Sequence, residues 1–168
     1  MQVVVGVDPG TTITGYGVVA DRGDGAVTLL ECGVVRPRAR APLAERLRDV
    51  HLGLCEVLAR HRPVALAVEA VFAGRNARTA VILAHARGVA LLAAAEVGVP
   101  AAELPPARVK QLVVGTGRAT KGQVARMLQH RLRLRTPPQP ADAADAVAVA
   151  LAFCLERAAP RRALRLRG

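Results

Sequence analysis

The stretch VVVGVDPGTTITGYGVV, residues 3–19, decides the fold. It begins with a run of β-branched residues, which is typical of a strand buried on both faces of a sheet. That run ends on Asp8, which Pro9 and Gly10 follow, and a second apolar run begins at Tyr16. A carboxylate at the end of a buried strand costs free energy unless a partner compensates for it. Asp8 is therefore a candidate for a hydrogen-bonded turn, a phosphate-binding loop or a metal site.

The rest of the chain alternates between short apolar strands and amphipathic helices. We expect strands over residues 2–7, 16–20, 26–35, 64–69 and 99–104, and helices over residues 42–61, 78–97, 106–115, 121–134 and 141–157. This order predicts an α/β fold with a five-stranded mixed sheet flanked by helices. Because no interdomain linker interrupts the pattern, we expect one domain over residues 1–157, followed by a basic, mobile tail over residues 158–168.

The composition favours a polyanionic partner inside the cell. The chain has 24 basic and 13 acidic residues, a formal net charge of +11, and nucleic acid is the commonest partner of so basic a protein. The alternative explanation of the high arginine content is a GC-rich genome, which encodes arginine frequently. The three cysteines show no CxxC spacing, which argues against a disulfide framework or a zinc site and suits a reducing cytoplasm. No signal peptide is evident, and charged residues interrupt the apolar stretch 80–100, so we expect a core helix there and no membrane span.

Four acids fall on otherwise apolar elements. Asp8 and Glu69 each end an expected strand, and if these strands are parallel neighbours, both carboxylates emerge at the same edge of the sheet. Asp142 and Asp145 share a face of the last helix, which must lie against the core. Each acid alone has a structural explanation, such as a turn or the helix dipole. Together they would repel one another, and hard divalent cations such as Mg²⁺ remove that repulsion. Two Mg²⁺ ions would equip such a cluster to hydrolyse a phosphodiester.

Four blocks of the sequence, taken in order, resemble one family, the RuvC crossover junction endodeoxyribonucleases of bacteria. The blocks are GVDPGTTITGYGVV, VEAVFAGRNARTAVILAHARGV, ARVKQLVVGTGRATKGQV and QPADAADAVAVA, and the likeness spans about residues 2–155. The resemblance implies an RNase H-like fold, a homodimer, and a cytoplasmic, nucleoid-associated endonuclease that resolves Holliday junctions by paired nicks in recombination and repair. It also implies the RuvA–RuvB branch-migration complex as a partner. The implied metal ligands and catalytic acids are Asp8, Glu69, Asp142 and Asp145, with two Mg²⁺ per active site and Mn²⁺ as a substitute.

Further residues are candidates for DNA contact. Phe72 stands in an expected loop among cations, where an aromatic ring can stack on an unpaired base or wedge a base step, although it could also fold back onto the core. Lys110 and Lys121 are the only lysines in an arginine-rich chain, which chance could also produce. The resemblance supports DNA contact for Phe72 and both lysines, and catalysis for Lys121. The candidate DNA-binding residues are Phe72, Arg75, Asn76, Arg78, Lys110 and Lys121.

The chain departs from the family pattern beside these candidates. Ala70 follows the candidate Glu69, where relatives often carry Gln, and Gly74 and Arg75 replace the more usual pair after the phenylalanine. None of these departures touches a carboxylate, but they leave the contacts near the cleaved strand less certain.

Other features have simpler interpretations. The threonines of GTTITG could cradle a phosphate, but an ordinary hairpin turn is the preferred interpretation. The histidines fall on helices at no metal-ligand spacing and are interpreted as surface or packing residues: His51, His61, His85 and His130. The helix over residues 78–97 is apolar on more than one face, so one face could pair with a second copy of the chain.

Three alternative functions stay open at this point. The stretch VDPGTT also resembles the first phosphate loop of sugar-kinase and actin-like ATPases, but the chain is too short for their two domains and has no second such loop. The second alternative is another RNase H-like nuclease that acts on RNA or on simpler DNA. The third is a junction-binding protein without catalysis, which the four acids argue against.

Overall fold

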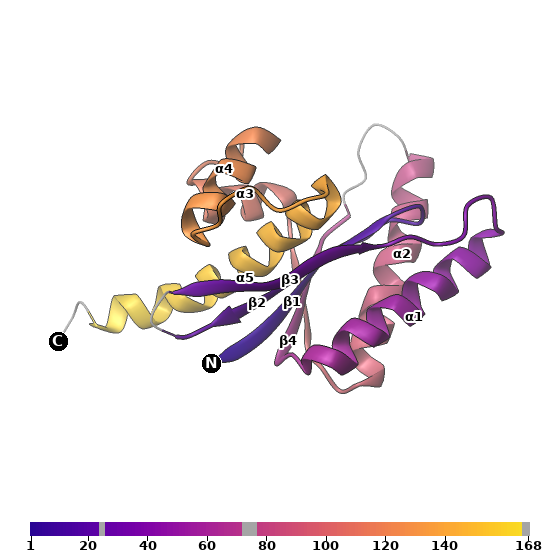
Figure 1. Cartoon of the computed structure of the whole chain (residues 1–168), viewed down its shortest axis with the longest axis horizontal. Helices are drawn as coiled ribbons and strands as arrows, with labels where there is room; N and C mark the ends of the chain where they lie inside the picture. The colour runs from indigo at the N-terminus through magenta and orange to yellow at the C-terminus, as the bar shows by residue number, and fades with distance from the viewer. Residues whose placement is uncertain (24–25, 72–76, 166–168) are drawn as a thin grey trace.

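A five-stranded mixed sheet organises the protein (Figure 1). The computed structural model describes residues 1–23, 26–71 and 77–165 of the chain, with side chains up to residue 158. The strands are β1 (Gln2–Asp8), β2 (Thr14–Asp21), β3 (Val27–Val35), β4 (Ala65–Glu69) and β5 (Ala101–Leu104), in the order β3-β2-β1-β4-β5. The pairs β1–β2 and β2–β3 are antiparallel, whereas β1–β4 and β4–β5 are parallel. This arrangement confirms the mixed five-stranded sheet that the sequence predicts.

The register of β1 and β4 brings their last residues to the same edge. Val7 pairs with Val68 across the parallel ladder, and the next residues along the chain are Asp8 and Glu69. β1 ends there because Pro9 follows Asp8 in the chain and cannot donate to the ladder, and β4 ends at Glu69. The two acids therefore lie on neighbouring strands at one edge of the sheet.

Helices cover both faces of the sheet (Figure 1). Helices α1 (Leu43–His61) and α2 (Ala77–Glu96) pack on the face to which Val5 and Val7 of β1 point. Helices α3 (Pro106–Val114), α4 (Lys121–Arg131) and α5 (Ala141–Arg165) lie on the opposite face. Val4 points to that second face and packs with residues of α5. Because both faces of β1 are buried, the strand needs an uninterrupted apolar run, which is the pattern at the start of the sequence.

Helix α5 lies almost directly on the backbone of β1 and β2. A Cβ atom added to Gly6 of β1 would come within 2.2 Å of the carbonyl oxygen of Ala146, and one added to Gly15 of β2 would come within 2.0 Å of the carbonyl oxygen of Asp142. Real Cβ atoms do not approach an oxygen so closely, so only glycine allows this packing. The first turns of α5 are thereby held against the strand that ends in Asp8.

The turn between β1 and β2 is closed by a side chain. The hydroxyl of Thr14 donates to the carbonyl oxygen of Gly10 at 2.6 Å and accepts from the backbone N–H of Gly10 at 3.2 Å. Thr14 is completely buried. These bonds support the hairpin-turn interpretation over a phosphate cradle built from backbone N–H groups, because the N–H of Gly10 already donates to Thr14.

Two helix ends differ from the expected positions. Helix α4 ends at Arg131 and not at residue 134, and α5 continues to Arg165, beyond the expected end at residue 157. The residues from 158 on were expected to form a separate basic tail, but the helix continues into them. The expectation of a mobile basic tail over residues 158–168 stays a prediction.

Helix α2 is the only helix of the described part of the chain that is long and apolar enough to cross a membrane by length and composition alone. Its buried residues are Ala86, Ala90, Ala93 and Ala94. Three of them, Ala90, Ala93 and Ala94, pack into the core between the sheet and α1. The helix therefore packs against the core on one side, and its exposed side includes the large apolar residues Val81 and Leu92.

The close packing of α5 on the sheet predicts the effect of a single methyl group. We expect Gly6→Ala to lower the free energy of unfolding by about 3 kcal/mol, because the new methyl group meets backbone atoms that cannot move aside. Gly122→Ala is the matched control, since a Cβ at Gly122 of α4 meets nothing within 4 Å, and alanine favours the helix by about 0.5–1 kcal/mol. Urea denaturation measures both. Equal stability of Gly6→Ala and the wild type would contradict the close packing.

Candidate active site

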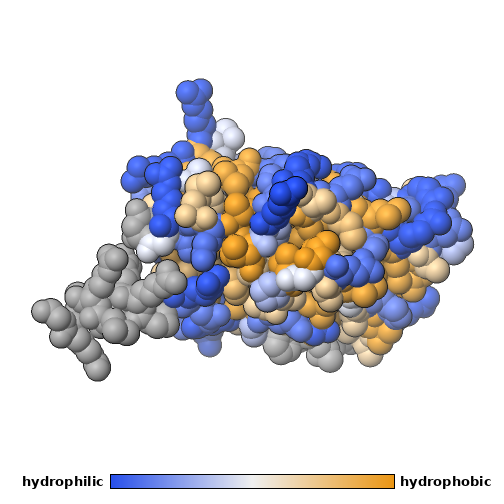
Figure 2. All heavy atoms as spheres, turned by 90° about the horizontal axis from the view of Figure 1, so that it is seen from below, coloured by the Kyte–Doolittle hydropathy of each residue, from blue (hydrophilic) through white to orange (hydrophobic). Residues whose placement is uncertain are grey.

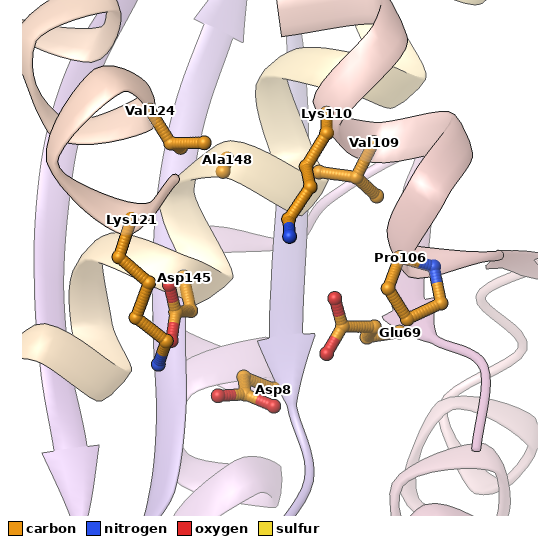
Figure 3. A pocket seen from close by; sticks show the side chains of 9 residues that line it. All are labelled: Asp8, Glu69, Pro106, Val109, Lys110, Lys121, Val124, Asp145 and Ala148. Atoms are coloured by element: carbon orange, nitrogen blue, oxygen red, sulfur yellow. The ribbon is translucent and has the colours of Figure 1, made fainter. Parts of the chain in front are cut away.

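Three carboxylates from distant parts of the sequence share one pocket of about 330 Å³. They belong to Asp8 of β1, Glu69 of β4 and Asp145 of α5, and Figure 3 shows their side chains directed toward a common space. The other residues that line the pocket are Pro106, Val109, Lys110, Lys121, Val124 and Ala148. The pocket thus combines acids at its floor with two lysines at its sides.

The fourth acid lies close to the other three. Asp142 is in the first turn of α5, one turn before Asp145, and its carbonyl group is the one that sits against Gly15. Asp142 does not line the pocket, but its charge contributes to raising the pKa of Asp8. The structure therefore brings all four predicted acids to one edge of the sheet, and the glycine contact with β2 is what seats the helix that carries two of them.

Burial and mutual repulsion disfavour the charged forms of the two strand acids. The pKa of Asp8 is raised from 3.8 to about 7, first by burial and then by the charges of Glu69, Asp145 and Asp142, while the charge of Lys121 acts in the opposite direction. Burial and the charge of Asp145 also raise the pKa of Glu69, which the lysines partly oppose. In the absence of another cation, the cluster therefore retains protons at a pH where ordinary carboxyl groups are ionised.

One lysine partly neutralises the negative charge of the carboxylate cluster. Lys121 is the first residue of α4, whose start is fixed by a capping box between Thr120 and Gln123. Its ammonium group donates to Oδ2 of Asp145 at 2.7 Å, and this bond raises the pKa of Lys121. The Lys121 side chain is still 78% exposed, so the ammonium group can also reach a ligand at the mouth of the pocket. Lys110 points into the same space from α3 (Figure 3).

The donor set fits a hard divalent cation. The polar side chains that line the pocket offer carboxylate oxygens and two ammonium groups, with no sulfur or imidazole ligand among them. Mg²⁺ binds oxygen ligands of this kind and leaves room for water and substrate oxygens. A bound cation would also lower the raised pKa values of Asp8 and Glu69, because it stabilises their charged forms.

A second pocket, lined by arginines, opens at the same edge of the sheet but on the opposite face. The sequence interpretation missed it. It has a volume of about 370 Å³, and its lining includes Arg36, Arg38, Arg40 and Arg46 together with Thr12 of the β1–β2 turn. Arg46 donates to the carbonyl oxygen of Thr11 at 3.3 Å, but its buried Nε has no partner among the described residues. The run RPRAR at residues 36–40 was the available sequence signal.

Some predicted DNA-contact residues cannot be placed. Phe72, Arg75 and Asn76, together with the departure at Gly74, lie outside the described residues. Arg78 is the second residue of α2 and is exposed. It lies on the segment that leads away from the end of β4, which carries Glu69.

A mixed sheet of this order, with acids from its first and fourth strands and from its last helix at one edge, defines the class of RNase H-like nucleases. The chain belongs to the RuvC family. The family model described as crossover junction endodeoxyribonuclease RuvC matches residues 4–153. A RuvC protein of Halorhodospira halophila is 50% identical over 161 residues, which are 95% of this chain and 94% of that protein. One from Pelotomaculum thermopropionicum is 48% identical over 150 residues, 89% of this chain and 91% of that protein.

Solved structures agree with this assignment. T. thermophilus RuvC in complex with a Holliday junction substrate superimposes with a TM-score of 0.89 at 40% identity, over 95% of this chain and 97% of that one. The yeast mitochondrial Holliday junction resolvase Ydc2 superimposes with a TM-score of 0.69 at 13% identity, over 95% of this chain and 80% of that one, and this likeness shows the fold alone. The fold expected from the sequence, RNase H-like, is confirmed.

The raised pKa of Asp8 predicts how stability depends on pH in the absence of metal. The unfolded chain releases this proton near pH 4 and the native protein near pH 7, so the native state binds more protons between these values and stability falls as the pH rises. We expect Asp8→Asn in EDTA to be more stable than the wild type at pH 8 by roughly 4 kcal/mol, and nearly equally stable at pH 4. Chemical denaturation at the two pH values measures the difference.

Asp21→Asn is the matched control, because Asp21 ends β2 at the opposite edge of the sheet. We expect this variant to show no such gain at pH 8. A stability difference for Asp8→Asn that is the same at both pH values would contradict the electrostatic description of the site.

Proposed function

We propose that the protein is a structure-specific endonuclease that resolves Holliday junctions by paired, symmetric hydrolysis of phosphodiester bonds, in recombination and DNA repair. The observation that carries this proposal is the convergence of Asp8, Glu69 and Asp145 in one pocket of a chain with net charge +11. Membership of the RuvC family supports the substrate class, as does a relative solved with a Holliday junction.

The four acids would hold two Mg²⁺ ions, for which Mn²⁺ substitutes. When bound, the ions supply activation of a water molecule and stabilisation of the leaving oxygen. The contribution of the chain is to hold Asp8 and Glu69 rigidly on neighbouring strands, and Asp142 and Asp145 on a helix fixed against the sheet. In this role the acids must be ionised, which the positive charge of the ions favours.

The lysines would bind the phosphodiester. Lys121 is largely exposed at the mouth of the pocket, and we assign its ammonium group to the scissile phosphate or the attacking water, as a catalytic residue. Lys110 lines the opposite side of the pocket and would contact DNA. A compact ammonium group on a flexible stem can follow the phosphate as its charge develops.

We assign further DNA contacts to Phe72, Arg75, Asn76 and Arg78, which follow β4 in the sequence, with Phe72 stacking on an unpaired base. The arginine pocket at residues 36–46 would hold a backbone phosphate, because the buried Nε of Arg46 has no acceptor among the described residues. This pocket lies beside the β1–β2 turn, at the same edge of the sheet as the acids but on the opposite face.

The outer face of α2 would join two copies of the chain. Val81 is 56% exposed and Leu92 is 52% exposed, and Ala84 and Gly88 are exposed between them at helical spacing. Small and apolar residues in such a row let two helices approach closely, and an exposed apolar patch commonly marks an interface. Figure 2 shows further apolar surface between hydrophilic residues on the face seen from below Figure 1. A symmetric dimer would present two active sites to two strands.

The cellular setting follows from the proposed substrate. A junction resolvase acts on the chromosome, so we place the protein in the cytoplasm at the nucleoid. We also assign the RuvA–RuvB branch-migration complex as its partner. An RNase H-like nuclease that acts on RNA or on simpler DNA is the alternative, and comparing substrates separates the two.

Cleavage of a labelled mobile four-way junction tests the proposed activity. We expect Asp8→Asn to abolish cleavage in Mg²⁺ and to retain junction binding in Ca²⁺, because the change removes a metal ligand and leaves the cationic surface intact. Asp21→Asn, at the opposite edge of the sheet, should cleave like the wild type. Linear duplex and RNA–DNA hybrid are the substrate controls. Cleavage of the hybrid in preference to the junction would support the alternative nuclease. Cleavage by Asp8→Asn at the wild-type rate would show that Asp8 is not part of the active site.

Light scattering after size-exclusion chromatography tests the dimer. We expect the wild type to be a dimer and Leu92→Asp to be a monomer, since a buried, unpaired carboxylate at the centre of the interface is costly. Leu30→Asp is the control, because Leu30 is 46% exposed and lies on β3, the edge strand opposite the side of the sheet formed by β4 and β5, which α2 contacts. A dimeric Leu92→Asp variant would place the interface elsewhere.

A further inference from the structure

Three potential metal ligands meet between α1 and the end of α2. Nε2 of His51 lies 2.8 Å from Oε2 of Glu96 and 3.6 Å from Sγ of Cys55. The ligand atoms of all three residues lie within 4.8 Å of one another. The expectation that no histidine has metal-ligand spacing was wrong for His51, because Cys55 follows it by four residues on the same helix face.

The separations approach those of a tetrahedral zinc site. With Zn–N and Zn–S bonds of about 2.05 and 2.3 Å, a tetrahedral ion holds its nitrogen and sulfur ligands about 3.6 Å apart, and Sγ of Cys55 lies 3.6 Å from Nε2 of His51. Sγ also lies 3.9 Å from Nδ1 of the same ring, so it sits beside the imidazole, and the Cys55 side chain must rotate to bring the sulfur in front of Nε2. The corresponding nitrogen–oxygen separation is about 3.4 Å, so Glu96 must retreat by roughly half an ångström. The Glu96 side chain is 48% exposed and is free to do so.

The ligand types also distinguish this cluster from the acid pocket. Thiolate and imidazole select zinc and related transition metals, whereas carboxylates and water suit magnesium. The two clusters lie at different places in the fold: α2 begins after β4, near the edge with the acids, and Glu96 ends it at the opposite edge, shortly before β5. The His51 side chain is 23% exposed, so an ion can enter from solvent.

We propose that His51, Cys55 and Glu96 form a second metal site, which binds one Zn²⁺ ion with a water molecule as the fourth ligand. On binding, the thiol proton of Cys55 and the proton on Nε2 of His51 leave to solvent, or the latter moves to Nδ1, and bonds from sulfur, nitrogen and oxygen to zinc replace them. No electron is transferred. The ion would join the middle of α1 to the last residue of α2 and so fix the helical layer on that face of the sheet.

Titration with Co²⁺ tests this site independently of the nuclease activity. Co²⁺ takes the place of zinc and shows an intense near-ultraviolet charge-transfer band only when a thiolate binds it, so Co²⁺ in the acid pocket does not contribute. We expect one thiolate-bound Co²⁺ per reduced, metal-stripped full chain, and loss of the band when one equivalent of Zn²⁺ is added. Cys55→Ser should abolish the band.

Further variants identify the remaining ligands. His51→Gln and Glu96→Gln should weaken Co²⁺ binding by more than about tenfold, since even the loss of an outer-shell partner costs about that much. Cys32→Ser and His130→Ala are the controls, because these residues lie on β3 and α4, and both should bind as the wild type does. Circular dichroism checks that each variant is folded.

Two results would overturn the proposal. One is the absence of the band from the folded wild type at excess Co²⁺, which would leave His51 and Glu96 as a simple ion pair. The other is an unchanged band in Cys55→Ser or unchanged affinity in His51→Gln. Junction cleavage by Cys55→Ser in Mg²⁺ should match the wild type, so failure of this site and failure of the nuclease assignment are separate outcomes.

Discussion

The contact between α5 and the glycines of β1 and β2 is the constraint on which the site depends. Without side chains at Gly6 and Gly15, the helix backbone rests on the strands, with the carbonyl group of Asp142 directly over Gly15. Any larger residue would lift the start of the helix. The last helix of the chain would then no longer bring its acids to the edge where β1 ends in Asp8. A packing contact between main chains thus determines where charges far apart in the sequence meet.

The electrostatics of the site follow from that geometry. Burial raises the pKa of Asp8 to about 7, and the neighbouring acids contribute to the shift. The cluster is therefore poorly stabilised as four carboxylates in the protein alone, and one lysine, Lys121, offsets only part of the repulsion through Asp145. The protein carries excess positive charge overall, which attracts a polyanion. Because four of its acids are concentrated at one edge of the sheet, it can still bind cations where the nucleic-acid backbone would be cut. The packing of α5 on the two glycines thus creates the acid cluster, and the cluster requires the cations on which the proposed chemistry depends.

Much of this could be predicted from the sequence, because the signals were local. The valine run identified β1, and the end of that run identified Asp8. The parallel pairing of β1 with β4 entered the sequence interpretation only as a condition, and the structure meets it. The packing of α5 on glycine could not be predicted, since nothing in the sequence says which residues face Gly15. The His51–Cys55–Glu96 cluster was missed for a similar reason: two of its members share a helix, but Glu96 joins them only through the packing of α2 on α1. The position of Phe72 lies outside the described residues.

Anomalous X-ray scattering from crystals soaked in Mn²⁺ would show whether the four acids bind divalent ions. We expect two anomalous peaks in the pocket, with at least one within about 2.2 Å of a carboxylate oxygen of Asp8, since Mn²⁺ takes the hard oxygen ligands of Mg²⁺. Glu69 and the two acids of α5 should complete the coordination. Full occupancy of Mn²⁺ elsewhere on the protein, with no peak beside Asp8, would show that the acids do not form a metal site.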